Sequence, residues 1–301
     1  MVDQPLRLRF YLESTLPVFS QTWIYAEQGS KVTLLTEGYG GQVSGTVSDL
    51  IEAHVQDNAF VQYSNVQNYS DDTVVLSNKK AICNKDARIS WILGYFGGRA
   101  ERSRLESTFV GDGASAEDIE VVFGNGYQRY DLVADLSHVA GNTKGRILCN
   151  SVLKDNARSV FKGMIRIGKE AKNANAYLAG HAILLSPNAK SDAIPGLEIL
   201  TNEVKATHSA SVQQIDDEQV FYMMSRGIPE EEARKFIVLG FLEPAISRIE
   251  SEELRDTIHS LLNAKWEGKK GLVIKSKEEV LFKDDKPATT QDIFEGHYKY
   301  R

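Results

Sequence analysis

The chain has 301 residues, of which 42% are hydrophobic and 25% charged, and its net charge at pH 7 is −6. This composition is typical of a soluble globular protein, and the length suits one large β domain with a smaller helical one. This net negative charge argues against a protein that binds nucleic-acid phosphates along a basic face.

The N-terminal residues MVDQPLRLRF carry charges where a secretion signal would have its apolar centre. No run of residues approaches the roughly 18 apolar residues of a membrane span. Cys83 and Cys149 are far apart, without CxxC spacing, which predicts buried and inert thiols in a reducing compartment. We therefore expect a soluble, cytoplasmic protein.

From about residue 5 to residue 215, short runs alternate apolar and polar residues, as in ARISWILGYFGG and AEDIEVVFGNG. Such alternation, bounded by Gly, Asn or Asp, predicts strands. The turns GDG and GNG are also typical of antiparallel sandwiches, so this alternative stays open.

Polar corners with a small or β-branched central residue recur at a short, slightly irregular spacing in the later part of this region. Each corner precedes an apolar strand, which predicts coils stacked in a β-solenoid. An antiparallel meander with coincidental corners is the alternative. We expect inward columns that include Val160, Met164, Ile183 and Leu185. The corners are Asn156-Ala157-Arg158, Glu170-Ala171-Lys172, Asn188-Ala189-Lys190 and Glu203-Val204-Lys205.

After Ile215 the pattern becomes helical. Acidic residues from Asp216 to Glu218 suit a first helical turn, and Gly227 suits the position after a helix end. Pro229 fits the first position of a second helix, and a third helix is predicted from Glu252 to Trp266. The apolar stripe of the second helix is expected to include Ala233, Phe236, Ile237 and Gly240.

The C-terminal extension, residues 269–301, contains a predicted strand pair, GLVIKSKEEVLF, and has no assigned role. The densest basic segment, Lys265 to Lys277, is interleaved with Glu267 and apolar residues. This mixture predicts a solvated surface.

Several enzyme signatures are absent from the sequence, including the phosphate-binding loop GxxxxGK[ST], GxSxG, HExxH and a complete GxGxxG. No two of the six histidines are spaced to share a helix face, and most suit surface or packing roles. His208 differs because it lies in the last predicted strand among small residues, and imidazole can bind metal or carry protons near neutral pH. His181, expected about two coils earlier, is predicted to face the same region.

Four ordered motifs resemble the SufB/SufD family of iron–sulfur cluster assembly scaffolds: NARSVFKGMIRI, IPGLEI, VKATHSAS, and IDDEQVFYMMSRGI followed by EEARKFIVLGF. The resemblance is clear from about Leu132 to Leu242. It implies a mainly β protein with a right-handed parallel β-helix over residues 1–215. It also implies a small helical domain over residues 216–268 that docks the ABC-type ATPase SufC.

The neighbours of the histidine distinguish the two branches of the family. SufB-type chains carry Glu-His-Glu where this chain has Thr207-His208-Ser209, and a cysteine in the strand that here reads AYLAGHAILL. SufD-type chains carry Lys-Cys-Ser-His-Gly, against Lys205-Ala206-Thr207-His208-Ser209 here. The chain therefore resembles SufD more closely.

The resemblance implies a scaffold without catalytic residues that pairs with a SufB-like chain or with itself. His208 becomes the candidate cluster ligand, with His181, Thr207 and Ser209 as possible supporting or interface residues. No tightly bound cofactor is expected, only a transient iron–sulfur cluster in the assembled complex. The sequence leaves two alternative functions: a β-helix carbohydrate-active enzyme and an ABC-type ATPase-associated protein of another role. The candidate SufC-docking residues are Phe221, Met224, Arg226, Phe236 and Phe241.

Overall fold

The computed structural model describes residues 5–41, 43–249 and 251–268. The strand pair expected in GLVIKSKEEVLF, the rest of the C-terminal extension and His297 lie outside the described residues. The last described strand ends at Gln214, and the first helix begins at Asp217.

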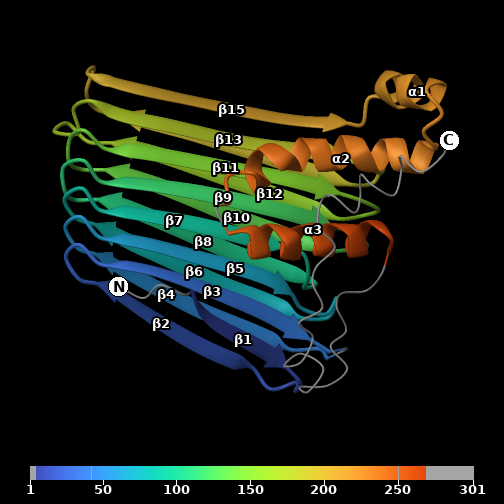
Figure 1. Cartoon of the computed structure of the whole chain (residues 1–301), viewed down its shortest axis with the longest axis horizontal. Coiled ribbons are helices and arrows are strands. Elements are labelled where there is room, and N and C mark those ends of the chain that lie inside the picture. Colours follow the sequence, from blue (N-terminus) through green and yellow to red (C-terminus); the bar gives the residue numbers. More distant parts are fainter. Residues whose placement is uncertain (1–4, 42, 250, 269–301) are drawn as a thin grey trace.

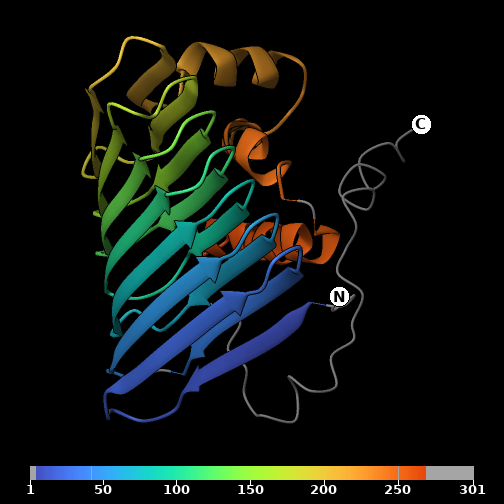
Figure 2. The same cartoon turned by 90° about the vertical axis from the view of Figure 1, so that its left-hand side faces the viewer.

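Two sheets face each other across the core (Figures 1 and 2). Odd-numbered strands form an eight-stranded sheet, and even-numbered strands form a seven-stranded sheet. We call these the odd sheet and the even sheet. The odd sheet contains β1 (Leu6–Leu12), β3 (Lys31–Gly40), β5 (Phe60–Asn68), β7 (Arg88–Tyr95), β9 (Ser115–Gly124), β11 (Lys144–Leu153), β13 (Ala174–Leu184) and β15 (Val204–Gln214). The even sheet contains β2 (Val18–Ala26), β4 (Thr46–Val55), β6 (Val74–Cys83), β8 (Ala100–Phe109), β10 (Arg129–His138), β12 (Arg158–Ile167) and β14 (Lys190–Ile199).

Every described strand pairs in parallel with the strand two positions along the chain. One coil therefore consists of two strands and two corners, and His181 and Ser211, which lie side by side in adjacent coils, are 30 positions apart. In Figure 1 the chain runs to the right along the nearer, odd sheet, returns behind it and climbs, which makes a right-handed solenoid of about seven turns. The predicted β-solenoid is confirmed, and the antiparallel sandwich and meander are wrong.

The corners form a repeating ladder. Before six successive odd strands, from β3 to β13, the corner residue has positive φ and donates its backbone N–H to the same corner of the next coil. Glycine, asparagine and aspartate tolerate this left-handed conformation best. The small residues Ala157, Ala171 and Ala189 are buried at three of the predicted corners. The six ladder residues are Gly29, Asn58, Asp86, Gly113, Asn142 and Asn173.

The predicted inward columns are wrong by one residue. Val160 and Met164 are half-buried on the outer face, whereas Phe161 and Ile165, the residues that follow them, point into the core. β12 has apolar residues at both parities, so alternation alone does not decide which face is inside. A shift of one residue exchanges the two faces of a strand.

Ile183 and Leu185 also point away from the solenoid interior, but for a different reason. They belong to an apolar cluster between the odd sheet and the helices. The outer face of this sheet therefore carries apolar residues of its own, which pack against the helices. The prediction assigned all apolar residues of this strand to the solenoid interior.

Three helices follow the strands: α1 (Asp217–Ser225), α2 (Glu230–Ile246) and α3 (Glu252–Trp266). The predicted bounds of α3 are confirmed. Gly227 has a φ of 88°, as expected after a helix end. Pro229 lies one residue earlier than predicted, as the N-cap of α2. No helix in the described ranges is long and apolar enough to cross a membrane.

The helices α2 and α3 lie across the outer face of the odd sheet, and α1 projects beyond β15 (Figures 1 and 2). α2 packs on β9 and β11. The predicted stripe of α2 is partly wrong, because Gly240 is exposed while Ala233 is buried. The buried residues of α2 are Ala233, Val238, Leu242, Ala245 and Ile246.

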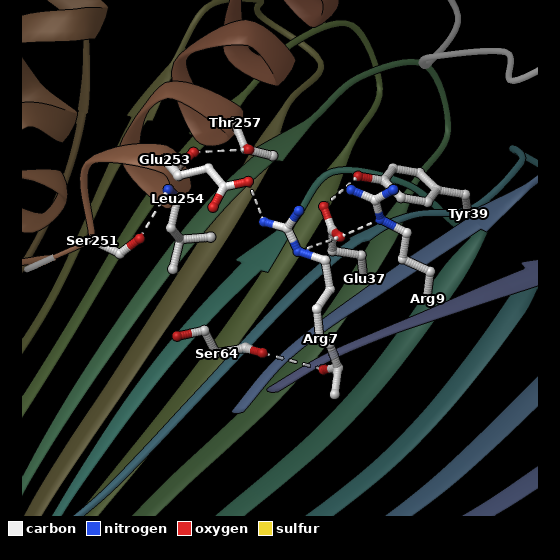
Figure 3. A network of polar contacts seen from close by, with 10 residues as sticks. Arg7, Arg9, Glu37, Tyr39, Ser64, Ser251, Glu253, Leu254 and Thr257 are labelled. Atoms are coloured by element: carbon white, nitrogen blue, oxygen red, sulfur yellow. Dashed lines mark hydrogen bonds and ion pairs between the residues drawn. The ribbon is translucent and has the colours of Figure 1, made fainter. Parts of the chain in front are cut away.

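The start of α3 is tied to the first coil by a polar network (Figure 3). Arg7 on β1 reaches both Glu253 on α3 and Glu37 on β3. Glu37 is buried and also accepts from Arg9 Nε at 2.8 Å and from Tyr39 Oη at 3.1 Å. This network joins residues 246 positions apart in the chain.

The end of α3 is anchored by Lys265, which is buried. Its Nζ donates to Asn125 Oδ1 and Gln128 Oε1, both at 2.7 Å, and to the backbone oxygen of Phe96. Burial lowers the pKa of Lys265 to about 7. The predicted solvated surface is therefore wrong for Lys265, because α3 covers it against the solenoid.

Candidate functional site

The C-terminal end of the solenoid is open. β14 and β15 are the last described strands of their sheets, and each pairs with one described strand only. An edge strand presents backbone N–H and C=O groups that can pair with another chain. Apolar side chains are exposed here as well, including Ile194 and Val212.

His208 lies at this open end, on β15. Its neighbour in the adjacent strand is Leu178, which is buried in the solenoid core. His208 therefore occupies the inward-facing row of the last coil, and its side chain is exposed because no described strand covers this row. Ala206 and Ala210, on either side of it in the same row, leave space around the ring.

His181 faces the opposite side of the odd sheet. It lies beside Ser211, with Nδ1 2.8 Å from Ser211 Oγ and Nε2 3.3 Å from Ser209 Oγ. The expectation that His181 faces the same region as His208 is wrong, because Ser211 and His208 are three residues apart on one strand and point to opposite faces. The two histidines also lie one coil apart rather than two.

The three-residue segment around His208 is thus divided between two faces. Thr207 and Ser209 point outward, and Ser209 contacts the His181 ring. Partial burial lowers the pKa of His181, which favours its neutral form. Within the described residues, no three His, Cys, Asp or Glu side chains cluster closely enough to hold a metal ion.

Both cysteines are inside the solenoid. Cys83 and Cys149 are buried and unbridged, which confirms the predicted buried thiols. Burial raises the pKa of Cys83 to about 12 and also raises that of Cys149. Neither thiol is positioned to act beside His208, since each lies in the core.

α1 exposes a large apolar face beside this open end. Phe221 is 73% exposed and Met224 44%, while Val220 fixes the helix from its buried side. Arg226 stacks over the ring of Tyr222 at 5.2 Å. Tyr222, itself 61% exposed, was not among the predicted residues, although its place beside Phe221 could have suggested it.

The two predicted α2 residues are less accessible. Phe236 is half-buried, and Phe241 packs in the apolar cluster between helix and sheet. The backbone oxygen of Phe241 accepts a hydrogen bond from Asn150 Nδ2 at 3.0 Å. Of the five docking candidates, Phe221, Met224 and Arg226 lie together at the surface.

Sequence reasoning missed a group of buried ionisable residues, which we call the interior cluster: Lys79, Glu101, Asp118 and Glu120. All four are at most 4% exposed and lie inside the solenoid. Lys79 Nζ lies 3.4 Å from Ser103 Oγ. The signal was present, since Lys79 shares its parity with the buried Ala81 and Cys83 on β6.

Burial dominates the protonation of this interior cluster. It raises the pKa of Glu101 to about 8 and that of Glu120 to about 7, although the positive charge of Lys79 acts in the opposite direction. Burial, together with the negative charge of Glu120, also raises the pKa of Asp118 well above its usual range. A cavity of about 80 Å³, lined in part by Glu101, adjoins the cluster toward the first coils.

Comparison with known proteins supports one family. Residues 10–241 match the family described as SUF system FeS cluster assembly, SufBD core domain. An iron–sulfur cluster assembly SufBD family protein of Staphylococcus saprophyticus is 31% identical over 255 residues, which cover 83% of this chain and 55% of that protein. Proteins of the same description from Staphylococcus epidermidis and Staphylococcus aureus are 30% identical with the same coverage. The chain thus spans about half the length of these relatives.

Proposed function

Because the chain belongs to the SufBD family of iron–sulfur cluster assembly proteins, we propose that it is a SufD-like scaffold subunit of a SUF complex. In this proposal residues 1–215 form the scaffold, and residues 216–268 form the docking domain for a SufC-like ATPase. The chain pairs with a SufB-like paralogue or with itself, works in the cytoplasm and catalyses no reaction of its own. We accordingly expect the purified chain to show no ATP turnover.

The exposed apolar face of α1 is the observation that carries this proposal. An aromatic ring exposed to 73%, as in Phe221, is costly in water and typical of an interface centre. Tyr222 and Met224 extend the same surface, and Arg226 adds a cation to it. Aromatic residues, Met and Arg are the residue types enriched in protein interfaces.

The test is co-purification of the full chain with its SufC-like ATPase. We expect the double substitution Phe221→Ala and Met224→Ala to weaken the complex at least tenfold, because it removes central apolar contacts. Arg226→Glu should also weaken it. Tyr127→Ala is the matched control, since Tyr127 is equally exposed, at 73%, but lies at a corner between β9 and β10. Undiminished capture by the double variant would refute the docking role of α1.

The open edge of β15 supports the pairing part of the proposal. A partner strand added there would cover His208 and the exposed apolar side chains of this end. The nascent cluster is cargo held at this junction, with His208 as one ligand. Thiolate or carboxylate ligands would come from the partner chain, since imidazole alone is a weak anchor for iron.

A further inference from the structure

A groove with an excess of positive charge lies on the outer face of the odd sheet, beside the end of α2. Its volume is about 370 Å³, within the range of roughly 300 to 1,000 Å³ that is usual for small-molecule sites. We call it the basic groove. Its charged lining residues in the described part of the chain are Arg88, Lys144, Arg146, Arg248 and Glu117.

Strand register places these cations on one surface. Arg88 and Lys144 lie in the same outward row, separated by Ser115, so that their backbones are about 10 Å apart. Arg146 lies two residues further along β11 and faces the same way. Arg248, two residues after the end of α2, also lines the groove.

Glu117 balances only part of the charge. Its Oε1 lies 2.9 Å from Arg248 Nη1 and 3.8 Å from Arg146 Nε, so two guanidinium groups share one carboxylate. Arg88 and Lys144 have no ion pair among the described residues. Four cations and one carboxylate give the groove a net charge of about +3, in a chain whose total is −6.

Neutral hydrogen-bonding groups complete the lining. Gln62, Ser90 and Asn175 lie in the two rows that carry the charges. Arg146 also stacks over the ring of Tyr177 at 5.2 Å, which holds its guanidinium against the floor of the groove. An anion held here would therefore meet oriented donors as well as charge.

We propose that the basic groove binds a small ligand carrying a diphosphate group. The planar guanidinium fork matches phosphate oxygens, and lysine adds a compact charge. The cations lie in two neighbouring rows of the sheet, with Arg88 and Lys144 in one and Arg146 in the next, so two linked phosphates can each meet a cation. This site lies on the outer face of the odd sheet, apart from α1 and from the inward row of His208, so it is independent of the proposed scaffold role.

The experiment titrates the purified full chain with inorganic pyrophosphate by calorimetry, at fixed ionic strength in a buffer without phosphate. We expect one site per chain and weaker binding of orthophosphate. Arg146→Gln should weaken pyrophosphate binding about tenfold, because it removes a charged hydrogen bond. Glu117→Gln should tighten binding several-fold, since it releases Arg146 and Arg248 from their shared carboxylate.

Arg102→Gln is the control, because Arg102 is an exposed cation on the outer face of the even sheet and should leave the affinity unchanged. Thermal unfolding of each variant reports whether the fold is intact. The proposal is overturned if pyrophosphate does not bind at millimolar concentration, or if Arg146→Gln and Arg102→Gln have equal effects. It is also overturned if orthophosphate binds as tightly as pyrophosphate.

Discussion

Ionisable side chains stand in opposite environments in the interior cluster and at the open end around His208. Glu101 and Lys79 are sealed between coils, at 4% and 0% exposure. His208 stands in the same inward row of the odd sheet as Asp118, but in the last coil, where no described strand covers it. One solenoid therefore contains both a closed polar interior and an open polar end.

The difference between them is solvent access. Inside, desolvation penalises charge, so the carboxyl pKa values rise and the protonation of the cluster is coupled to folding. At the open end, water and a partner chain can reach the imidazole directly. A group that must exchange ligands suits the open end, whereas the interior cluster determines how stability responds to pH.

The largest expected effect comes from Lys79→Met. This change removes the positive charge that lowers the pKa values of Glu101, Asp118 and Glu120. Leaving buried charge uncompensated typically costs about 3 to 5 kcal/mol. We expect a loss of this order in the free energy of unfolding at pH 8, measured by urea denaturation. At pH 5 the loss should be smaller, because the carboxyls are then protonated.

Lys80→Met is the matched control for that experiment. Lys80 is the next residue on β6 but points outward into solvent, so its replacement should change stability by less than about 0.5 kcal/mol. Equal losses in the two variants would contradict a special role for the buried charge.

A smaller effect is expected from Glu101→Gln, and it should depend on pH. The pKa of Glu101 is about 8 in the folded chain and 4.5 in an unperturbed carboxyl. Between these values the folded state holds more protons than the unfolded state, so its stability falls as pH rises. A glutamine side chain at this position cannot ionise, and the variant should gain about 3 kcal/mol relative to the wild type between pH 5 and pH 8.

The informative quantity is the difference in the free energy of unfolding between the wild type and Glu101→Gln at each pH, because other buried groups titrate in the same range. Burial lowers the pKa of His138 to about 4 and that of Lys265 to about 7. Both groups make stability rise with pH, His138 between about 4 and 6.5 and Lys265 between about 7 and 10.5. Their contributions cancel in the comparison. An offset between the variants that is constant from pH 5 to pH 8 would count against the raised pKa of Glu101.

The sequence predicted the repeating parts of this molecule and missed the parts that depend on stacking. Corner residues such as Ala157 and the bounds of α3 follow from local chemistry. The surroundings of Lys79 come from the strands of neighbouring coils. Those of Lys265 include Asn125 and Gln128, which are 140 and 137 positions earlier in the chain. Burial of a lysine is decided by such distant neighbours, which a single sequence does not reveal.

An effect of intermediate size on stability is expected from replacing Arg7, which is partly exposed and links β1 to α3. Arg7→Ala should lower the free energy of unfolding by about 1 kcal/mol, since Glu37 keeps its pairing with Arg9. Backbone amides at the start of α3 should exchange hydrogen faster. Arg102→Ala, on the outer face of the even sheet, is the control and should leave both measurements unchanged.

The smallest effect on stability is expected from His208→Ala, although its effect on assembly should be large. The side chain is exposed and packs under no described strand, so its removal should change the free energy of unfolding by less than about 0.5 kcal/mol. Under the proposed docking role of α1, capture of a SufC-like ATPase should persist, because α1 is unchanged. If the imidazole holds iron at the junction with a partner, the assembled complex should acquire much less iron and sulfide during reconstitution.

Thr207→Ala is the control: Thr207 is also exposed and adjoins His208, but it points to the other face of β15. The two variants thus separate a ligand role from a general effect on the edge strand. Equal iron and sulfide contents in wild type and His208→Ala complexes of the same oligomeric state would exclude the ligand role.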